Sequence, residues 1–200
     1  NIAIFESAER AGGRVHSVPL GNDVRFDVGP TWYWPHQQHM QRLVAELGLE
    51  PIEQHIDGDA LYELAPSQLQ RRGGDMGMLS YRVAGGLARL TDQLSAQLPA
   101  GALRLRHAVE RIQHDGDTWT LWSRGTAVAS RARRLALAIP ARVVAATFGD
   151  SDWLPSGLKP ALLRTPTWMA TQAKFVAVYE RPFWRLDGLC GDAFSRIRPL

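Results

Sequence analysis

The sequence predicts an α/β fold with an added antiparallel sheet, on three observations. The chain opens on a short apolar run at residues 2–5, which has the length of a buried strand and no helical period. Two segments, residues 36–47 and 87–98, carry apolar residues at helical spacing, and a glycine or a proline follows each. Between residues 103 and 130 apolar residues alternate with polar ones, as in half-exposed strands. This order of elements is typical of an α/β fold with an antiparallel addition.

The elements between and after these segments are predicted from the same patterns. Residues 23–28 predict a short strand because glycine-containing turns bound them on both sides. Residues 51–80 show little periodicity and contain Pro66 and several glycines. The second half predicts strands at residues 103–109, 118–122, 126–130, 134–139 and 172–180, and a short helix at 158–163. The dipeptide Arg124-Gly125 predicts a hairpin turn between two of these strands.

Composition excludes several classes of function. The net charge is +3 and the basic residues are spread along the chain, so we expect no nucleic-acid surface. A single cysteine, Cys190, excludes an internal disulfide and a zinc cluster. His36 and His39 have no acidic partner at ligand spacing, so we expect no metal site. The longest apolar stretch, residues 135–148, is interrupted by Pro140, and no signal peptide is visible. We therefore expect no membrane segment and a cytoplasmic location.

The opening stretch, "IAIFESAERAGGRVHS", places an acid at the tip of a predicted strand and a glycine pair beside an arginine. In nucleotide-binding sheets an acid in this position, here Glu6, accepts hydrogen bonds from ribose hydroxyls. Glycines such as Gly12 and Gly13 let the backbone approach a pyrophosphate, and an arginine such as Arg14 binds phosphate bidentately. The alternative is a solvated strand end followed by a glycine turn and an exposed arginine. The residues by themselves leave both interpretations open.

Lys174 lies in the predicted strand at 172–180, on one face with Val176 and Val178. A lysine among apolar residues is costly to bury unless its charge is paired or its pKa is lowered, which is typical of functional sites. The alternative is a lysine on an edge strand whose ammonium group reaches the solvent. Trp32 begins an aromatic cluster at the loop end of the strand at 23–28, where cofactor sites form in α/β folds. We expect the two aromatic residues after it to serve packing.

Several separated blocks of the sequence resemble, in order, the flavin-containing amine oxidase family, the monoamine and polyamine oxidase group. The blocks are "FESAERAGGRVHS", "FDVGPTWYWP", "ELGL", "VAGGLARLTDQLSAQL", "VERI", "RRLALAIPARV" and "AKFVAVYERPFWR". They cover most of the chain except residues 51–80. The order of the blocks carries the resemblance, since each block alone is short.

The resemblance implies an FAD-binding, Rossmann-like domain of the glutathione-reductase type with an interleaved substrate domain on a mixed or antiparallel sheet. Residues 1–56 and 81–147 would form the FAD-binding domain, and residues 57–80 and 148–200 the substrate domain. The family pattern extends beyond both ends of this sequence and is longer in the middle. We therefore expect the chain to be a fragment that lacks N-terminal and C-terminal parts of the fold.

The resemblance also implies roles at the adenosine and phosphate end of FAD. Glu6 would bind the adenosine ribose. Gly12, Gly13 and Arg14 would lie against the pyrophosphate, and Val109 would hold the adenine through its backbone.

At the flavin end, the resemblance implies that Gly29, Thr31 and Trp32 pass beside the ring system. Lys174 matches the lysine that the family places under the flavin N5 atom, bridged to it by a water. Pro30 departs from the family pattern, which often has a smaller residue beside the flavin. The expected site thus has Glu6 and Lys174 at opposite ends of one long cofactor.

The implied function is FAD-dependent oxidation of a small amine, by hydride transfer to flavin N5, hydrolysis of the imine and reoxidation by O2 to give hydrogen peroxide. A related alternative keeps the fold and changes the substrate, as in desaturases and protoporphyrinogen oxidases that act on large apolar molecules. A third alternative is an inactive FAD-binding fragment or a partner subunit, because the phosphate-binding turn that should precede the first strand is not in this sequence.

Overall fold

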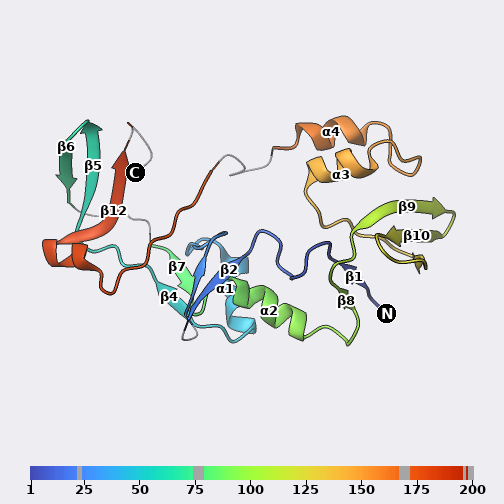
Figure 1. The fold of residues 1–200 in the computed structure, drawn as a ribbon, viewed down its shortest axis with the longest axis horizontal. Coiled ribbons are helices and arrows are strands. Elements are labelled where there is room, and N and C mark those ends of the chain that lie inside the picture. Colours follow the sequence, from blue (N-terminus) through green and yellow to red (C-terminus); the bar gives the residue numbers. More distant parts are fainter. Residues whose placement is uncertain (22–23, 74–78, 167–171, 196, 198–200) are drawn as a thin grey trace. The chain divides into compact units, whose positions relative to one another are not determined.

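The computed structural model describes residues 1–21, 24–73, 79–166, 172–195 and 197. By their internal contacts the residues form two compact units, each built from separate stretches of the chain. The first unit comprises Asn1–Gly13 and Ser95–Ala173, and the second comprises Arg14–Leu94 and Lys174–Leu200. Both units combine strands with helices, so the predicted mixed α/β content is confirmed (Figure 1).

In the second unit two short antiparallel strand pairs lie close to two helices. The bounds are β2 (Ser17–Gly21), β3 (Val24–Asp27), α1 (Gln38–Glu46), β4 (Pro51–Glu53), β7 (Tyr81–Val83) and α2 (Ala88–Ala96). β2 pairs with β3, and β4 pairs with β7. The strand predicted at 23–28 and the helices predicted at 36–47 and 87–98 are confirmed as β3, α1 and α2. Gly48 ends α1 as expected, since its φ of 62° lies in the left-handed region.

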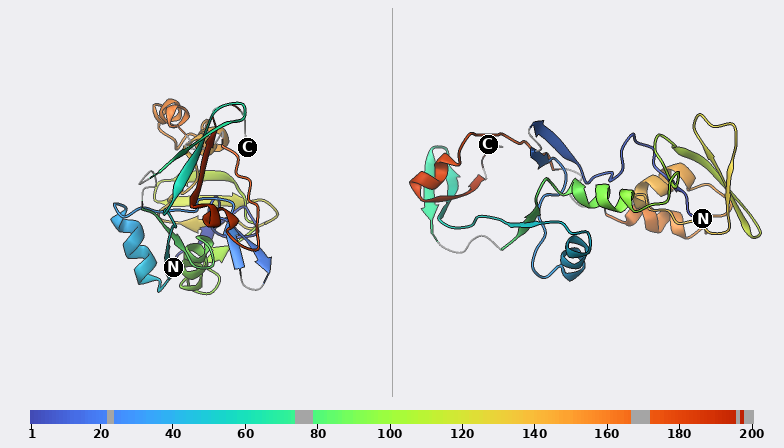
Figure 2. Two further views of the ribbon diagram at one scale, coloured as in Figure 1. Left: turned by 90° about the vertical axis from the view of Figure 1, so that its left-hand side faces the viewer. Right: turned by 90° about the horizontal axis from the view of Figure 1, so that it is seen from below.

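A mixed three-stranded sheet completes the second unit. It consists of β5 (Asp59–Ala65), β6 (Gln68–Arg72) and β12 (Leu189–Ser195). β5 is the central strand, antiparallel to β6 and parallel to β12. A 3₁₀ helix, η1 (Phe183–Asp187), leads into β12. Figure 2 shows, in two further views, the red strand β12 beside the hairpin of β5 and β6.

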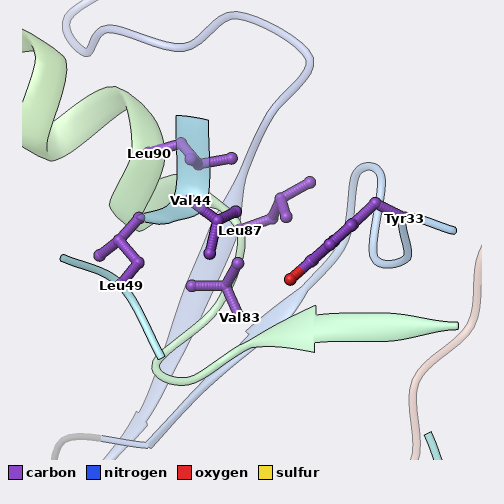
Figure 3. Packing of buried hydrophobic residues seen from close by; sticks show 6 residues of the cluster. All are labelled: Tyr33, Val44, Leu49, Val83, Leu87 and Leu90. Atoms are coloured by element: carbon purple, nitrogen blue, oxygen red, sulfur yellow. The ribbon is translucent and has the colours of Figure 1, made fainter. Parts of the chain in front are cut away.

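The core of the second unit joins its helices to the β4–β7 pair. The buried side chains converge from α1, from the loops before it and after it, from β7 and from the start of α2 (Figure 3). They are Tyr33, Val44, Leu49, Val83, Leu87 and Leu90. This core fixes the loop that carries residues 29–34 against the rest of the unit, because Tyr33 also pairs with Tyr81 through backbone hydrogen bonds.

The first unit has a separate core beneath an antiparallel sheet. Its elements are β1 (Ile4–Phe5), β8 (Leu103–Arg104), β9 (Val109–Asp115), β10 (Thr118–Ser123), β11 (Ser130–Ala132), α3 (Ala141–Phe148) and α4 (Leu158–Arg164). β1 pairs in parallel with β8, and β10 is the central strand between β9 and β11. Ile112 and Leu121 from the sheet pack with Val144 and Phe148 from α3.

Four predicted strands differ from the structure. The expected strand at 103–109 is interrupted, because Arg106 has a φ of 60° and the chain turns there between β8 and β9. The strand expected at 126–130 lies later, as β11. Residues 134–139 and 172–180 form no strand, since no neighbouring segment among the described residues pairs with them. Phe175 is accordingly 92% exposed. The short helix predicted at 158–163 is confirmed as α4.

The contact-based units divide the chain at residues other than the predicted boundaries at 56, 81 and 147. The assignment of residues to an FAD-binding and a substrate domain therefore stays a prediction. Among the helices in the described ranges, none is long and apolar enough to cross a membrane.

Candidate functional site

Lys174 binds the loop that follows β3. Its ammonium nitrogen Nζ donates hydrogen bonds to the backbone oxygen of Gly29 at 2.5 Å, to that of Asp27 at 3.2 Å, and to Thr31 Oγ1. A lysine ammonium carries three N–H donors, so these acceptors use all three. The segment after residue 172 is thereby tied to residues 27–31, which lie far from it in the sequence.

The environment of Lys174 has two opposing effects on its charge. Partial burial lowers the pKa of Lys174 below its ordinary value of 10.5, and the negative charge of Asp27 acts against this effect. The alternative of a lysine reaching the solvent from an edge strand is wrong, because the segment is not a strand and Nζ is bound to three protein oxygens.

Trp32 lies next to this ammonium group. The Lys174 Nζ atom is 5.4 Å from the centre of the Trp32 ring, within the range of a cation–π interaction. The indole N–H of Trp32 donates to Gln54 Oε1 at 3.3 Å, and 46% of the residue is exposed. Tyr33, in contrast, is buried in the core, which confirms its expected packing role, and burial raises its pKa. Trp32 thus offers an accessible aromatic face beside a cation.

Gly29 allows two backbone segments to lie unusually close together. A Cβ atom at this position would lie 2.0 Å from the backbone oxygen of Arg14. The amides of Val28 and Gly29 both donate to the backbone oxygen of His16, at 3.0 and 3.2 Å. Only glycine fits here, because real Cβ atoms do not approach other atoms so closely.

Asp27 holds the start of α2 through a buried hydrogen-bond network. Its Oδ1 atom accepts from Ser17 Oγ at 2.5 Å and from the backbone amide of Leu87 at 2.8 Å. Ser17 Oγ in turn accepts from the amide of Ala88 at 3.0 Å. The first amides of a helix have no partners within the helix, so this network satisfies two of them. Gly86 permits the contact, since a Cβ there would lie 2.5 Å from Ser17 Oγ.

Glu6 directly follows β1 in the first unit, and its backbone is hydrogen-bonded at both the amide and the carbonyl. Its amide donates to the oxygen of Arg104 at 3.0 Å, and its backbone oxygen accepts from the amide of His107 at 2.9 Å. The Oε1 atom accepts from the amide of Ala8 at 2.7 Å and from the hydroxyl of Ser7 at 3.2 Å. Among the described residues, none donates to Oε2. That oxygen is therefore the one able to accept a hydrogen bond from a ligand.

The glycine pair after Glu6 forms a turn held by an arginine. Gly12 and Gly13 have φ values of 94° and 53°, which favour glycine. The Arg10 guanidinium donates to the backbone oxygens of Ala11, at 3.1 Å, and Gly13, at 2.6 Å. Binding these carbonyls fixes the orientation of the peptide units in the turn. The neighbouring Arg14 is exposed, so its guanidinium is accessible to an anion.

Val109 begins β9, at the edge of the described three-stranded sheet. It is half-buried and packs against the cluster of Ile112 and Leu121. Because β9 pairs with β10 on one side, alternate backbone groups along the strand point away from β10. The predicted backbone contact of Val109 with the adenine stays a prediction, and the Val109 side chain packs in the core.

The sequence matches the family described as flavin containing amine oxidoreductase over residues 1–73 and 65–199. The chain belongs to this family. The resemblance of its separated blocks is therefore confirmed, and FAD is the cofactor of the family to which it belongs.

Individual members of the flavin-containing amine oxidoreductases match parts of the chain. Putrescine oxidase of Kocuria rosea is 35% identical over 65 residues, which are 32% of this chain and 13% of that protein. The flavin-containing amine oxidase A of Bos taurus is 28% identical over 114 residues, 55% of this chain and 22% of that protein. The chain thus matches less than a quarter of the length of these relatives.

Solved structures of the family share the fold. A putrescine oxidase bound to putrescine has a TM-score of 0.79 at 18% identity, covering 96% of this chain and 64% of the other. Cyclohexylamine oxidase from Brevibacterium oxydans has a TM-score of 0.78 at 16% identity, covering 98% and 64%.

The residues of this family member fit a flavin dinucleotide in two places. In the first unit a carboxylate oxygen of Glu6 lacks a protein donor among the described residues, and Gly13 of the glycine turn is exposed. In the second unit Gly29 lets the loop pass close to Arg14, while Lys174 and Trp32 lie side by side.

Two functional features were not predicted from the sequence. Arg10 was not recognised as the residue that binds the glycine turn, although it stands three residues before Gly13 in the same block. Asp27 was not recognised as the cap of α2, because its partner amide is 60 residues away. The pair Gly85-Gly86 before a helix without a conventional capping residue was the available signal.

Proposed function

We propose that this chain supplies part of an FAD-dependent amine oxidase that acts on small amines. For a primary amine the overall reaction is amine, O2 and water giving aldehyde, ammonia and hydrogen peroxide. The observation that carries the proposal is the binding of Lys174 by the loop at 27–31, beside the exposed ring of Trp32. A cation held in this way is suited to stabilise negative charge nearby.

Bound FAD would accept a hydride equivalent from the carbon next to the amine nitrogen. Glu6 would accept hydrogen bonds from the ribose hydroxyls through Oε2, the oxygen with no donor among the described residues. Gly12 and Gly13 would admit the pyrophosphate, with Arg14 as the accessible cation. Val109 would contact the adenine through its backbone.

At the flavin end, Gly29, Thr31 and Trp32 would form the wall beside the ring system. Lys174 would place its positive charge beside that wall, with its three N–H donors bound by Asp27, Gly29 and Thr31. The lowered pKa of Lys174 means that its proton leaves more readily than that of an exposed lysine, so it is suited to take part in proton exchange at this site.

Anaerobic bleaching by an amine tests the proposal. The purified chain is loaded with FAD and mixed with putrescine under nitrogen, and the visible flavin absorbance is followed. We expect the yellow colour to bleach. The Lys174→Met variant should bleach at about one tenth of the native rate or at a lower rate. Lys159→Met is the matched control, because Lys159 lies on α4 in the other unit and pairs there with Asp150.

The other outcomes decide between the alternatives. A yellow protein that does not respond to amines would favour the related enzymes that act on large apolar substrates. A chain that stays colourless with added FAD would favour a partner fragment without its own cofactor site.

A further inference from the structure

Of the three acceptors around Lys174, two are backbone oxygens and one is the hydroxyl of Thr31. We propose that Thr31 is the positioning residue for Lys174, whose third N–H it holds and whose charged form it stabilises. A role of Thr31 in catalysis rests on the proposed function, because Lys174 is the catalytic lysine only in that proposal. Its geometry belongs to the second unit alone.

The two backbone acceptors are fixed by the fold. The oxygen of Asp27 belongs to β3, which pairs with β2. The oxygen of Gly29 belongs to a segment whose backbone amides donate to the His16 oxygen. Gly29 itself lies so close to the Arg14 backbone that a Cβ would not fit between them. Neither oxygen can turn away without moving the backbone. The Thr31 hydroxyl is the acceptor that a side-chain substitution removes.

The hydroxyl itself is oriented toward Lys174. Thr31 Oγ1 donates its proton to the backbone oxygen of Gly29 at 3.4 Å. A hydroxyl has one proton and two lone pairs, so Oγ1 is left as an acceptor for Lys174 Nζ. Threonine is branched at Cβ and has few χ1 states, and the residue is half-buried. The hydroxyl is therefore held in a direction that suits an ammonium donor.

Removing this acceptor should act on the charged form of Lys174. A hydrogen bond to a charged group favours that form, so its loss adds to the effect of burial, which already lowers the pKa of Lys174. Asp27 is the charged group that acts on Lys174, and it raises this pKa. Its carboxylate is held by Ser17 and by the Leu87 amide, so a change at Thr31 leaves it in place.

The test is a proton titration of the lysines by NMR. The sequence contains two lysines, Lys159 and Lys174, so a chain labelled with ¹³C at the lysine Cε gives two side-chain signals. Lys159, whose Nζ lies 2.6 Å from Asp150 Oδ1, is the internal control. Thr31→Val keeps the shape and removes the hydroxyl, whereas Thr31→Ser keeps the hydroxyl and removes the methyl group.

We expect Thr31→Val to lower the titration midpoint of Lys174 and to leave that of Lys159 unchanged. Thr31→Ser should keep the native midpoint of Lys174. An unchanged Lys174 midpoint in Thr31→Val would overturn the inference, as would an equal fall in Thr31→Ser or a parallel fall at Lys159. If Thr31→Val does not fold by far-UV circular dichroism, Thr31→Ala is measured against the same criteria.

The titration needs neither flavin nor amine, so it separates this inference from the proposed function. Absence of amine-dependent bleaching would refute the proposed function and leave the role of Thr31 standing. An unchanged Lys174 midpoint would refute the role of Thr31 whatever the flavin does.

Discussion

Replacing Asp27 by alanine removes the network that caps α2. The Oδ1 atom accepts two hydrogen bonds, from Ser17 Oγ and from the Leu87 amide, and Asp27 is only 8% exposed. Water cannot readily replace the carboxylate there, so the Leu87 amide would be left buried without its partner. A hydrogen bond to a charged group contributes about 1.5–3 kcal/mol, and an unsatisfied buried amide costs about 1–3 kcal/mol.

Because these contributions overlap, we expect Asp27→Ala to lower the free energy of unfolding by about 3 kcal/mol. Urea denaturation followed by far-UV circular dichroism measures this change. Asp92→Ala is the matched control, since it removes an exposed carboxylate that pairs with Arg25 at 2.9 Å. An exposed ion pair of this kind contributes about 0–1 kcal/mol.

Asp27→Asn refines the test, because the amide keeps an acceptor oxygen and loses the charge. We expect its effect to lie between those of Asp27→Ala and Asp92→Ala. Equal stability losses for Asp27→Ala and Asp92→Ala would refute the reasoning that the buried network holds α2.

Two further predictions concern the same loop. Gly29→Ala puts a Cβ 2.0 Å from the Arg14 oxygen and should lower the free energy of unfolding, measured by urea denaturation, by about 1–3 kcal/mol. Gly157→Ala is the control and should change it little, because no neighbouring atom lies within 4 Å of a Cβ at that position. Equal effects of the two substitutions would contradict the close approach at Gly29. The folded state holds the Lys174 proton less tightly than the unfolded chain, so the free energy of unfolding should rise with pH between the lowered pKa and 10.5. Lys174→Met should remove this contribution, and an identical pH slope in the variant would count against the lowered pKa.

The local part of the fold was predictable because it depends on local patterns. α1 and α2 have one apolar face each, and Gly48 marks the end of α1 in the sequence and in the structure. The family's blocks also placed Lys174 and Gly29 in one site, and the structure brings these two residues into contact. Local spacing therefore predicted the helices, whereas the family resemblance, and not spacing, placed Lys174 and Gly29 in one site.

The rest depends on partners that spacing does not reveal. β5 pairs with β12, and their side chains Glu63 and Ser195 meet although they are 132 residues apart. Both faces of β6 are exposed, so it lacks an alternating pattern. Conversely, residues 172–180 alternate and yet form no strand, because no described segment pairs with them. The acceptors of Lys174 likewise come from residues more than 140 positions away.

The affinity for FAD compared with that for FMN measures most directly whether Glu6 binds the adenosine part of the cofactor and whether Lys174 binds the flavin part. FMN lacks the adenosine part, so Glu6→Gln should weaken FAD binding by about 10–100-fold and leave FMN binding unchanged. Lys174→Met should weaken both, and Glu9→Gln, which alters an exposed ion pair with Arg106, should weaken neither. Equal FAD affinity in the native chain and in Glu6→Gln, measured by quenching of flavin fluorescence, would contradict this account.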